Sequence, residues 1–593
     1  MTYDGPVRKR ALTPLSHSES RYHGFHPGAS EVLPAGYRHH KDSLPLPVDV
    51  IRETDVALTM RDGVKLYADV FRPVASTPVP AIVNWAPYGK GQTGFWDLRN
   101  NKMFPNHFGV PRRAVSGLQS WEGNDPAYWC RHGYAVVQVD SRGAFNSEGD
   151  VIFFGSAEGR DGHDAIEAVA DMDWCSGKLG IAGNSWLAAA QWHIAAQRPP
   201  HLVAIAPWEG FRDLYRELIA RGGIPSLAFV SLIGEKMYGP KLREDPIAML
   251  EEHPLFDDYW ADKVADVSRI TVPAYVVASY TNPLHPPGTL HNWAALEGPK
   301  WLRVHNSQEW PDFYSHAATD DLRRFFDRYL LDHDNGWETT PSVRLAVLDP
   351  GHQDEINRIE DQFPPARTTF KDLFLNADST ALEHVAPSEY GVVGYDLQSN
   401  APHVNFVHTF HNDVEVIGRP LATIWLSVDG HDDADIYLQI QKLDSKGRQQ
   451  WHQAVDLGLP LARKWMPVAR RLGVSAVQSA FYPGPTGMLR ASRRGLDPSR
   501  PQSDPELLLT AESKISTTKP ICVEIPLWPV AMRWHAGEQL RLQISGRNPI
   551  PSPLPGLAPD PMQPGRRHEI HTGSQYESRI TLPIAPIRTP RAD

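Results

Sequence analysis

The fold is decided by the stretch Gly180-Ile-Ala-Gly183-Asn184-Ser185-Trp186-Leu187-Ala188-Ala-Ala-Gln-Trp192. The apolar run 179–182 leads into a glycine, a serine follows on the turn, and residues 187–197 favour a helix. This order predicts a strand, a sharp turn and a helix, an arrangement that lifts a serine hydroxyl clear of the sheet. The helix N-terminus behind it would stabilise developing negative charge. Ser185 is therefore the candidate nucleophile, although Leu187 stands where the G-x-S-x-G pattern has its second glycine.

Length and charge limit the class of protein. A chain of 593 residues is too long for one core and predicts two or three domains. No stretch approaches the ~20 uninterrupted apolar residues that a membrane span requires. A net charge of -11 without a long basic run argues against a nucleic-acid or anionic-membrane partner.

The cysteine content indicates a reducing compartment. Cys130, Cys175 and Cys522 are too few in so long a chain for a disulfide scaffold or a metal-ligand cluster. The N-terminus lacks a charged start followed by an apolar core, the pattern of a secretory signal. We therefore expect a cytoplasmic protein.

The first half of the chain reads as a parallel sheet with helices on both faces. Residues 1–50 are polar and rich in proline, and we expect an extended arm. From residue 51 to 341, short apolar strands without alternation are separated by helical stretches, which is typical of strands buried on both faces. The clearest strands are Ala81–Trp85, Tyr134–Val139, Leu202–Ala206, Ala274–Ala278 and Trp301–Val304.

Two further regions follow from the change in pattern. Residues 211–270 have helical periodicity and are expected to form a helical cap over the carboxyl ends of the strands. Residues 342–593 contain segments in which apolar and polar residues alternate, such as 421–428 and 539–544. Half-buried antiparallel strands alternate in this way, so the last part is predicted to be a β-sandwich.

An ordered set of motifs identifies a family. The set comprises Met60-Arg-Asp-Gly-Val64, Asn84-Trp-Ala-Pro-Tyr88, Val139-Asp140-Ser-Arg142-Gly143, Trp174-Cys-Ser-Gly177, Gly183-Asn-Ser-Trp-Leu-Ala188 and Leu489-Arg-Ala-Ser492. From about residue 50 to the end, the chain resembles the CocE/NonD hydrolases, the family of cocaine esterase, X-Pro dipeptidyl-peptidase and α-amino-acid ester hydrolase. The resemblance implies an α/β-hydrolase domain with a helical cap and a C-terminal jelly-roll domain, acting on esters or amides through an acyl-serine.

The resemblance also implies an oxyanion hole. Its donors would be the Tyr88 hydroxyl and the backbone N–H of Trp186. Two preorganised donors aimed at a developing alkoxide are worth several kcal/mol, roughly 3 kcal/mol each.

The other two members of the triad depart from the family. Most members carry an aspartate after the strand that corresponds to Ala274–Ala278, where the nearest residue of this chain is Asn282. An amide cannot carry the charge that stabilises an imidazolium. The family's histidine follows the last strand, where this chain has His305, displaced toward the strand end.

Several residues could complete a triad with Ser185. His305 is the preferred base, because the carboxyl end of the last strand faces the elbow in a doubly wound sheet. Glu209, directly after the next strand along the chain, is the preferred acid, which keeps the serine–acid–histidine order of the fold. Alternative acids are Glu309 and Asp312, and the alternative base is His285.

We therefore predict a serine hydrolase that cleaves an ester or amide of a small molecule and needs no metal or organic cofactor. An ester is preferred over an N-terminal dipeptide, because no carboxylate can be assigned to bind a substrate amine. The alternatives are an acyltransferase or cyclase that uses the same acyl-serine, and a non-catalytic binding protein on a degenerate hydrolase scaffold. Assembly into a homo-oligomer is left open, with the sandwich and the arm as contact surfaces.

Overall fold

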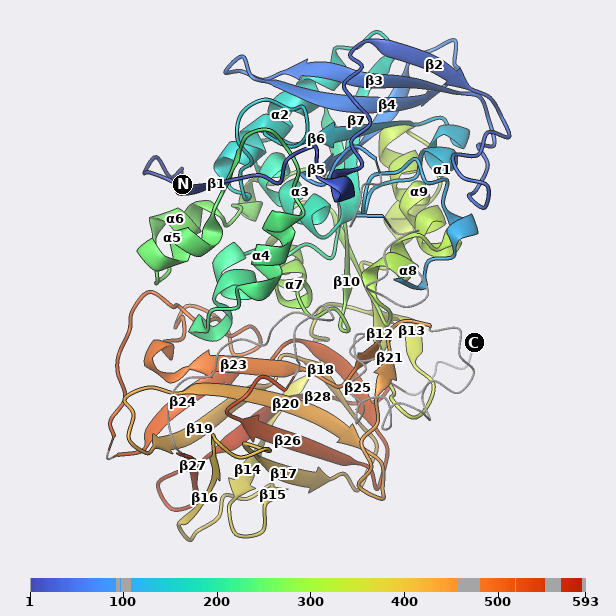
Figure 1. Ribbon diagram of the computed structural model, residues 1–593. Helices are drawn as coiled ribbons and strands as arrows, with labels where there is room; N and C mark the ends of the chain where they lie inside the picture. The colour runs from blue at the N-terminus through green and yellow to red at the C-terminus, as the bar shows by residue number, and fades with distance from the viewer. Residues whose placement is uncertain are drawn as a thin grey trace.

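The computed structural model describes residues 2–91, 96–97, 108–456, 480–517, 519–549 and 567–588. These residues form an α/β domain and a β-sandwich, which occupy the upper and lower halves of Figure 1. Among the described residues, no helix combines the length and the apolar character needed to cross a bilayer.

The α/β domain is built around a mixed sheet, which has eleven strands among the described residues. Its strand order is β13-β12-β11-β10-β8-β7-β5-β6-β4-β3-β2. The strands are β2 (Ala29–Leu33), β3 (Val50–Thr59), β4 (Lys65–Pro73), β5 (Val79–Ala86), β6 (Ala135–Asp140), β7 (Cys175–Asn184), β8 (Leu202–Trp208), β10 (Ala274–Ser279), β11 (Lys300–His305), β12 (Val343–Val347) and β13 (Glu355–Glu360). The run from β6 to β12 is parallel, and every residue of β5, β6 and β10 is buried.

Helices cover both faces of this sheet, which explains why its strands are apolar without alternation. On one face, α1 and α9 pack with Ile82, Val136 and Val277 in one core. On the other face, α2, α3 and α7 pack with the alternate strand residues, such as Val83 and Val137. The helices are α1 (Pro126–Arg131), α2 (Ser156–Ala170), α3 (Trp186–Ala196), α7 (Pro286–Ala295), α8 (Glu309–Phe313) and α9 (His316–Leu330).

The edges of the sheet extend beyond the boundaries expected from the sequence. Residues 1–50 are not a plain arm, because β2 pairs with β3, and β1 (Lys9–Ala11) pairs with β9 (Leu242–Glu244). At the other edge, β12 pairs with β11, so the sheet continues past the expected boundary at residue 342. The strands β1, β2 and β13 are short and mostly exposed, so they carry little hydrophobic periodicity, whereas β12 is mostly buried and belongs to the sheet that precedes it.

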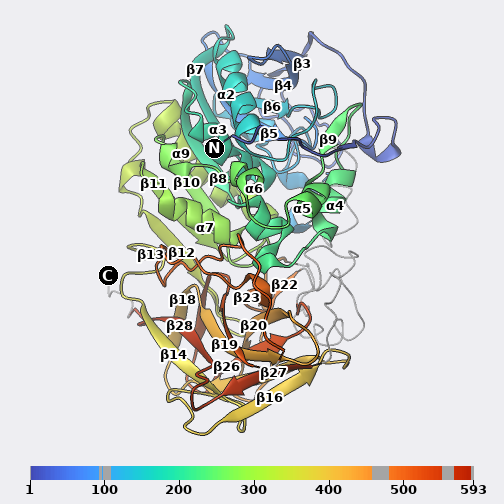
Figure 2. The ribbon, with the colours of Figure 1, turned by 90° about the vertical axis from the view of Figure 1, so that its left-hand side faces the viewer.

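The segment between β8 and β10 is mainly helical, as its periodicity predicts, and its helices α4, α5 and α6 lie on one side of the α/β domain, above the sandwich (Figure 2). It contains the π-helix η4 (Leu214–Ile219), the 3-10 helices η5 (Arg221–Gly223) and η6 (Val267–Arg269), and the α-helices α4 (Ala228–Glu235), α5 (Pro246–Glu252) and α6 (Asp258–Asp262). We refer to residues 211–270 as the cap.

The sandwich is built from antiparallel strands with alternating burial, as in β17, where every second residue is buried. Its strands are β14 (Thr369–Asn376), β15 (Ala381–Glu383), β16 (Gly391–Asp396), β17 (His403–Thr409), β18 (Val414–Gly418), β19 (Leu421–Val428), β20 (Asp435–Leu443), β23 (Thr486–Arg490), β24 (Ile521–Pro526), β25 (Val530–Trp534), β26 (Gln539–Ser545), β27 (Arg567–Thr572) and β28 (Arg579–Ala585). The strands β21 (His452–Gln453) and β22 (Phe481–Tyr482) pair with each other in a separate sheet. The predicted fold class, an α/β-hydrolase domain followed by a jelly-roll β-sandwich, is confirmed.

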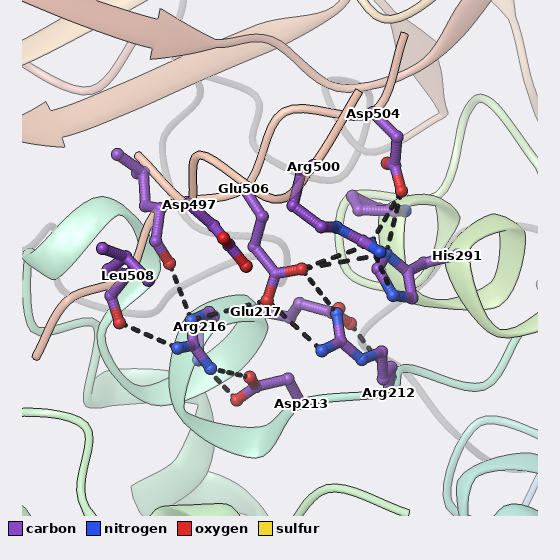
Figure 3. Close-up of polar contacts among 12 residues, drawn as sticks. Arg212, Asp213, Arg216, Glu217, His291, Asp497, Arg500, Asp504, Glu506 and Leu508 are labelled. Atoms are coloured by element: carbon purple, nitrogen blue, oxygen red, sulfur yellow. Dashed lines mark hydrogen bonds and ion pairs between the residues drawn. The ribbon is translucent and has the colours of Figure 1, made fainter. Parts of the chain in front are cut away.

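Ion pairs fix a loop of the sandwich against the cap (Figure 3). Arg212 makes two parallel bonds to Glu506, of 3.0 and 3.2 Å. Arg216 donates to the carbonyl oxygens of Leu507 and Leu508, both at 2.8 Å. Although burial opposes it, the Arg212 guanidinium lowers the pKa of Glu506 to about 2. The carboxylate therefore stays charged, and the sandwich holds the start of the cap in place.

Candidate active site

The nucleophile elbow has the geometry that its sequence predicts. Ser185 lies between the end of β7 and the start of α3 with φ 56° and ψ -117°. Such positive φ values are strained for a residue with a side chain and are typical of this turn. Gly183 has φ 146°, and a Cβ there would lie 2.6 Å from the Leu187 Cβ. The glycine before the serine is thus required sterically, because Leu187 fills the space next to it.

Ser185 opens onto a small cavity of about 60 Å³ whose wall combines polar and aromatic side chains. The polar residues of the wall are Tyr88, Glu122, Asn282, His285, Gln308 and Glu309, and the aromatic ones are Trp96, Phe108, Trp121, Phe229 and Trp310. A narrower cavity, with Phe153, Phe154 and Phe211 in its wall, also borders Ser185, Tyr88 and His285. A few polar groups converging on a mostly apolar cavity are typical of a ligand site.

The two candidate oxyanion donors lie beside the serine. Burial, and then the carboxyl groups of Glu122 and Glu309, raise the pKa of the Tyr88 hydroxyl well above its usual value, so it stays protonated and can donate. Trp186 is the first residue of α3, where backbone N–H groups have no partner within the helix. Its indole N–H donates to Glu158 Oε1 at 3.0 Å, which anchors this residue.

His305 and Glu209 form a close pair. The distance from His305 Nε2 to Glu209 Oε1 is 2.7 Å, and the backbone N–H of Ser307 donates to His305 Nδ1 at 3.3 Å. Both ring nitrogens are therefore engaged. Among the described residues, the walls of the two cavities at Ser185 include His285 but not His305.

Asp312 takes another role. It makes a paired contact with the Arg303 guanidinium, with a bond of 2.9 Å from Nη1 to Oδ1. Although burial opposes it, Arg303 lowers the pKa of Asp312. The Asp312 charge is thus matched by an arginine rather than by a histidine facing the cavity.

His285 lies in the turn after β10, directly before α7. Asn282 shapes this turn, since its Oδ1 accepts the backbone N–H groups of Leu284 at 2.8 Å and His285 at 3.2 Å. The His285 Nε2 lies 3.7 Å from Glu309 Oε2. Its Nδ1 is buried and has no hydrogen-bond partner among the described residues. Burial lowers the pKa of His285 to about 3, so at neutral pH the ring is uncharged and able to accept a proton.

One amide links the two histidine–carboxylate pairs. The Asn282 Nδ2 donates to Glu209 Oε2 at 2.9 Å and to Glu309 Oε2 at 3.2 Å. Burial raises the pKa of Glu309 to about 8, although the bond from Asn282 opposes the shift. Burial, and then the charges of Glu309 and Asp312, raise the pKa of Glu209 well above its usual value. Both carboxyl groups thus resist ionisation, and Glu309 is the one that lines the cavity at Ser185.

Comparisons with known proteins agree with this architecture. The X-Pro dipeptidyl-peptidase (S15 family) profile matches residues 62–238, and the X-Pro dipeptidyl-peptidase C-terminal non-catalytic domain matches residues 335–581. The structure of a CocE/NonD family hydrolase from Staphylococcus aureus is 30% identical, with a TM-score of 0.81, over 91% of this chain and 94% of that one.

Curated relatives match over shorter segments. The cocaine esterase of Rhodococcus sp. (strain MB1 Bresler) is 32% identical over 163 residues, 28% of this chain and 24% of its own length. A putative serine esterase of Mycobacterium bovis is 28% identical over 191 residues, 31% of this chain and 28% of its own length. The chain thus matches about a quarter of the length of these relatives. Domain order, elbow and full-length similarity to the Staphylococcus aureus structure together lead to one conclusion: this chain belongs to the CocE/NonD family of hydrolases.

Proposed function

We propose that the protein is a serine esterase in which Ser185 is the nucleophile, His285 the general base and Glu309 the acid that orients it. The observation that carries the proposal is the shared cavity, since Ser185, Tyr88, His285 and Glu309 all line it. A triad is recognised by geometry and by the role of each group, not by position in the sequence.

This assignment revises the base and the acid predicted from the sequence. His305 and Glu209 do pair with each other, but both ring nitrogens of His305 have partners other than Ser185. The alternatives His285 and Glu309 therefore take the two roles. Relative to the family pattern, the base moves to the turn after β10 and the acid to the turn after β11.

The exchange is geometrically simple. The strands β10 and β11 are parallel neighbours, and Ser279 pairs with His305 at their carboxyl ends. The turns after both strands therefore lie at the same edge of the sheet, where ligands bind in folds of this type. A histidine on one of these turns can therefore contact a carboxylate on the other, whether the histidine follows β10 or β11.

The proposed reaction proceeds through an acyl-serine intermediate. His285 accepts the proton of the Ser185 hydroxyl, and the alkoxide attacks the ester carbonyl carbon to give a tetrahedral intermediate. Tyr88 and the Trp186 N–H donate to its oxyanion. The imidazolium, stabilised by the Glu309 carboxylate, protonates the departing alcohol. Water, deprotonated by the same imidazole, then releases the acid and restores the Ser185 hydroxyl.

In this mechanism the Glu209–His305 pair does not react with the substrate but helps to position Glu309 through the Asn282 amide that the two glutamates share. Glu209 and Glu309 share the Asn282 amide, and burial raises the pKa of both carboxyl groups. We place the single negative charge of the site on Glu309, because this carboxyl lines the cavity together with His285 and Glu209 does not. An aspartate at position 282 would add a third carboxyl group to this cluster, so the amide suits the site better.

A second candidate substrate class is an ester that carries an amine. The Glu122 carboxyl lines the cavity, and its Oε2 is buried without a hydrogen-bond partner among the described residues. Burial, and then Glu309, raise the pKa of Glu122 well above its usual value. An ammonium group next to it would favour the ionised form. Comparing alanine esters with butyrate esters of the same alcohol, in wild type and Glu122→Gln, separates the two classes.

The direct test of the proposed function is Ser185→Ala. We expect the loss of p-nitrophenyl ester turnover and of fluorophosphonate labelling, because no acyl-enzyme can form. An unchanged rate would remove Ser185 from the mechanism. Product analysis with added alcohols tests the acyltransferase alternative, and absence of labelling in the wild type would favour the binding-protein alternative.

A cytoplasmic location and a homo-oligomer stay predictions, to be tested by fractionation and light scattering.

A further inference from the structure

Four metal-ligating side chains converge at the junction of the two domains, on elements that the proposed active site does not use. Asp349 and His352 follow β12 of the α/β sheet, and His535 and Glu538 lie in the turn between β25 and β26 of the sandwich. One ligand atom from each lies within 4.8 Å of the other three. Two imidazoles and two carboxylates are thus collected from both domains.

The atoms are paired so that each imidazole faces one carboxylate oxygen. His535 Nε2 lies 2.8 Å from Asp349 Oδ2, and His352 Nε2 lies 3.1 Å from Glu538 Oε1. The centroids of the two imidazole rings are 4.4 Å apart. In a tetrahedral zinc site with bonds of about 2.0–2.2 Å, neighbouring ligand atoms are separated by roughly 3.3 Å, close to these distances.

The remaining atoms of the cluster are held by outer partners. Lys442 Nζ contacts Asp349 Oδ1 at 2.6 Å and Glu538 Oε2 at 2.9 Å, the two oxygens that the histidines leave free. His535 Nδ1 lies 3.3 Å from Asp413 Oδ2. Metal-bound histidines usually donate their other ring N–H to a carboxylate, and bound carboxylates are themselves hydrogen-bonded. Lys442 and Asp413 thus occupy the positions of the outer partners that surround the ligands in metal sites.

Charge and access also suit a divalent cation. Three carboxylates (Asp349, Asp413 and Glu538) outnumber the Lys442 ammonium, and the nearby Arg533 is itself paired with Glu355 and Glu415. Asp349 and Glu538 are buried, whereas His352 is exposed, so an ion can enter from solvent.

We propose that this cluster binds one divalent transition-metal ion, with Zn²⁺ as the best match, through Asp349 Oδ2, His352 Nε2, His535 Nε2 and Glu538 Oε1. Imidazole ligands select such ions over Mg²⁺ and Ca²⁺, which prefer sites made of oxygens.

The role that follows is structural. The backbone already joins the two domains here, since the Leu348 N–H donates to the Ala531 carbonyl and the Arg533 N–H to the Leu348 carbonyl, both at 2.9 Å. An ion bound by residues on each side of this seam cross-links the α/β sheet to the sandwich. This inference is independent of the proposed esterase chemistry.

The test uses the full chain after treatment with EDTA and titration with Zn²⁺ and Co²⁺. We expect one Zn²⁺ per chain by calorimetry, a visible absorption band of tetrahedral Co²⁺, and a higher Tm with Zn²⁺ than without. The double variant His352→Ala/His535→Ala should lose all three effects. His333→Ala, which removes an exposed histidine of the α/β domain, is the matched control and should keep them.

An outer-contact variant distinguishes this site from adventitious binding to surface histidines. Asp413→Asn leaves all four proposed ligands in place but removes the carboxylate behind His535. Loss of such a partner typically weakens metal binding by about 10- to 100-fold. Equal Zn²⁺ affinity in the wild type and the double variant, no Zn²⁺ binding by the wild type, or unchanged affinity in Asp413→Asn would each overturn the proposal. Circular dichroism of every variant verifies its fold.

Discussion

Replacing Glu309 with glutamine removes the proposed triad charge and little else. The side chain keeps its length, and the new amide oxygen can still accept the bond that Asn282 donates at 3.2 Å in the wild type. The imidazolium of His285 loses its counter-charge. By analogy with an aspartate-to-asparagine change in a serine protease triad, we expect kcat to fall by about 10⁴. This corresponds to ~5.5 kcal/mol of transition-state stabilisation.

The pH dependence adds a second, independent signature. The base His285 has a pKa of about 3 and stays neutral above that value, whereas the pKa of Glu309 is about 8. Only the ionised carboxylate stabilises the imidazolium, and one pH unit below the pKa about one-tenth of it is ionised. Wild-type kcat/KM should therefore rise by about tenfold between pH 7 and pH 9. In Glu309→Gln this rise should be absent.

The assay is steady-state hydrolysis of p-nitrophenyl butyrate from pH 6 to 9.5, corrected for the spontaneous reaction. Glu209→Gln is the matched control, because it changes the other carboxyl held by Asn282, and it should lower kcat by less than about tenfold and keep the alkaline rise. If Glu309→Gln kept the wild-type rate and pH profile while Glu209→Gln lost activity, the Glu209–His305 pair would be the acid and base after all.

Two further substitutions test the rest of the elbow. Tyr88→Phe removes one oxyanion donor and should lower kcat by about 10²–10³ with little change in KM; an unchanged kcat would exclude the phenol from the oxyanion hole. Gly183→Ala places a Cβ 2.6 Å from that of Leu187 at a φ of 146°, and by strain and overpacking it should lower the free energy of unfolding in denaturant by about 2–5 kcal/mol. Wild-type stability in that variant would contradict the steric account of the turn.

The elbow was predictable from sequence because its determinants are local. A buried strand, a glycine without room for a Cβ, one serine and a run of helix formers are consecutive residues. The alternating strands of the sandwich were predictable for the same reason, since each strand carries its own period. The proposed oxyanion donors, the Tyr88 hydroxyl and the Trp186 N–H, came from the resemblance to the family, and their role stays a prediction.

The choice of histidine depended on side-chain direction, which a motif does not give. Residues two apart on a strand point to the same face. In β11, Leu302 and Val304 join one core, and Trp301 joins the core on the other face. His305 lies four residues after Trp301 and therefore points to the same face of the sheet as Trp301. Alternation along the strand was thus the available signal that His305 points away from the core that contains Trp186. The turn that carries His285 is shaped by Asn282, and such a turn is not evident from the sequence.

The proposed mechanism requires His285, and not His305, to remove the proton from Ser185. The most direct measurement is the single-turnover rate of Ser185 acylation by an activated ester in His285→Ala and in His305→Ala, each compared with the wild type. The account predicts a loss of about 10⁴–10⁶ in the first variant and less than about tenfold in the second. Rapid acylation in His285→Ala together with a collapse in His305→Ala would contradict it.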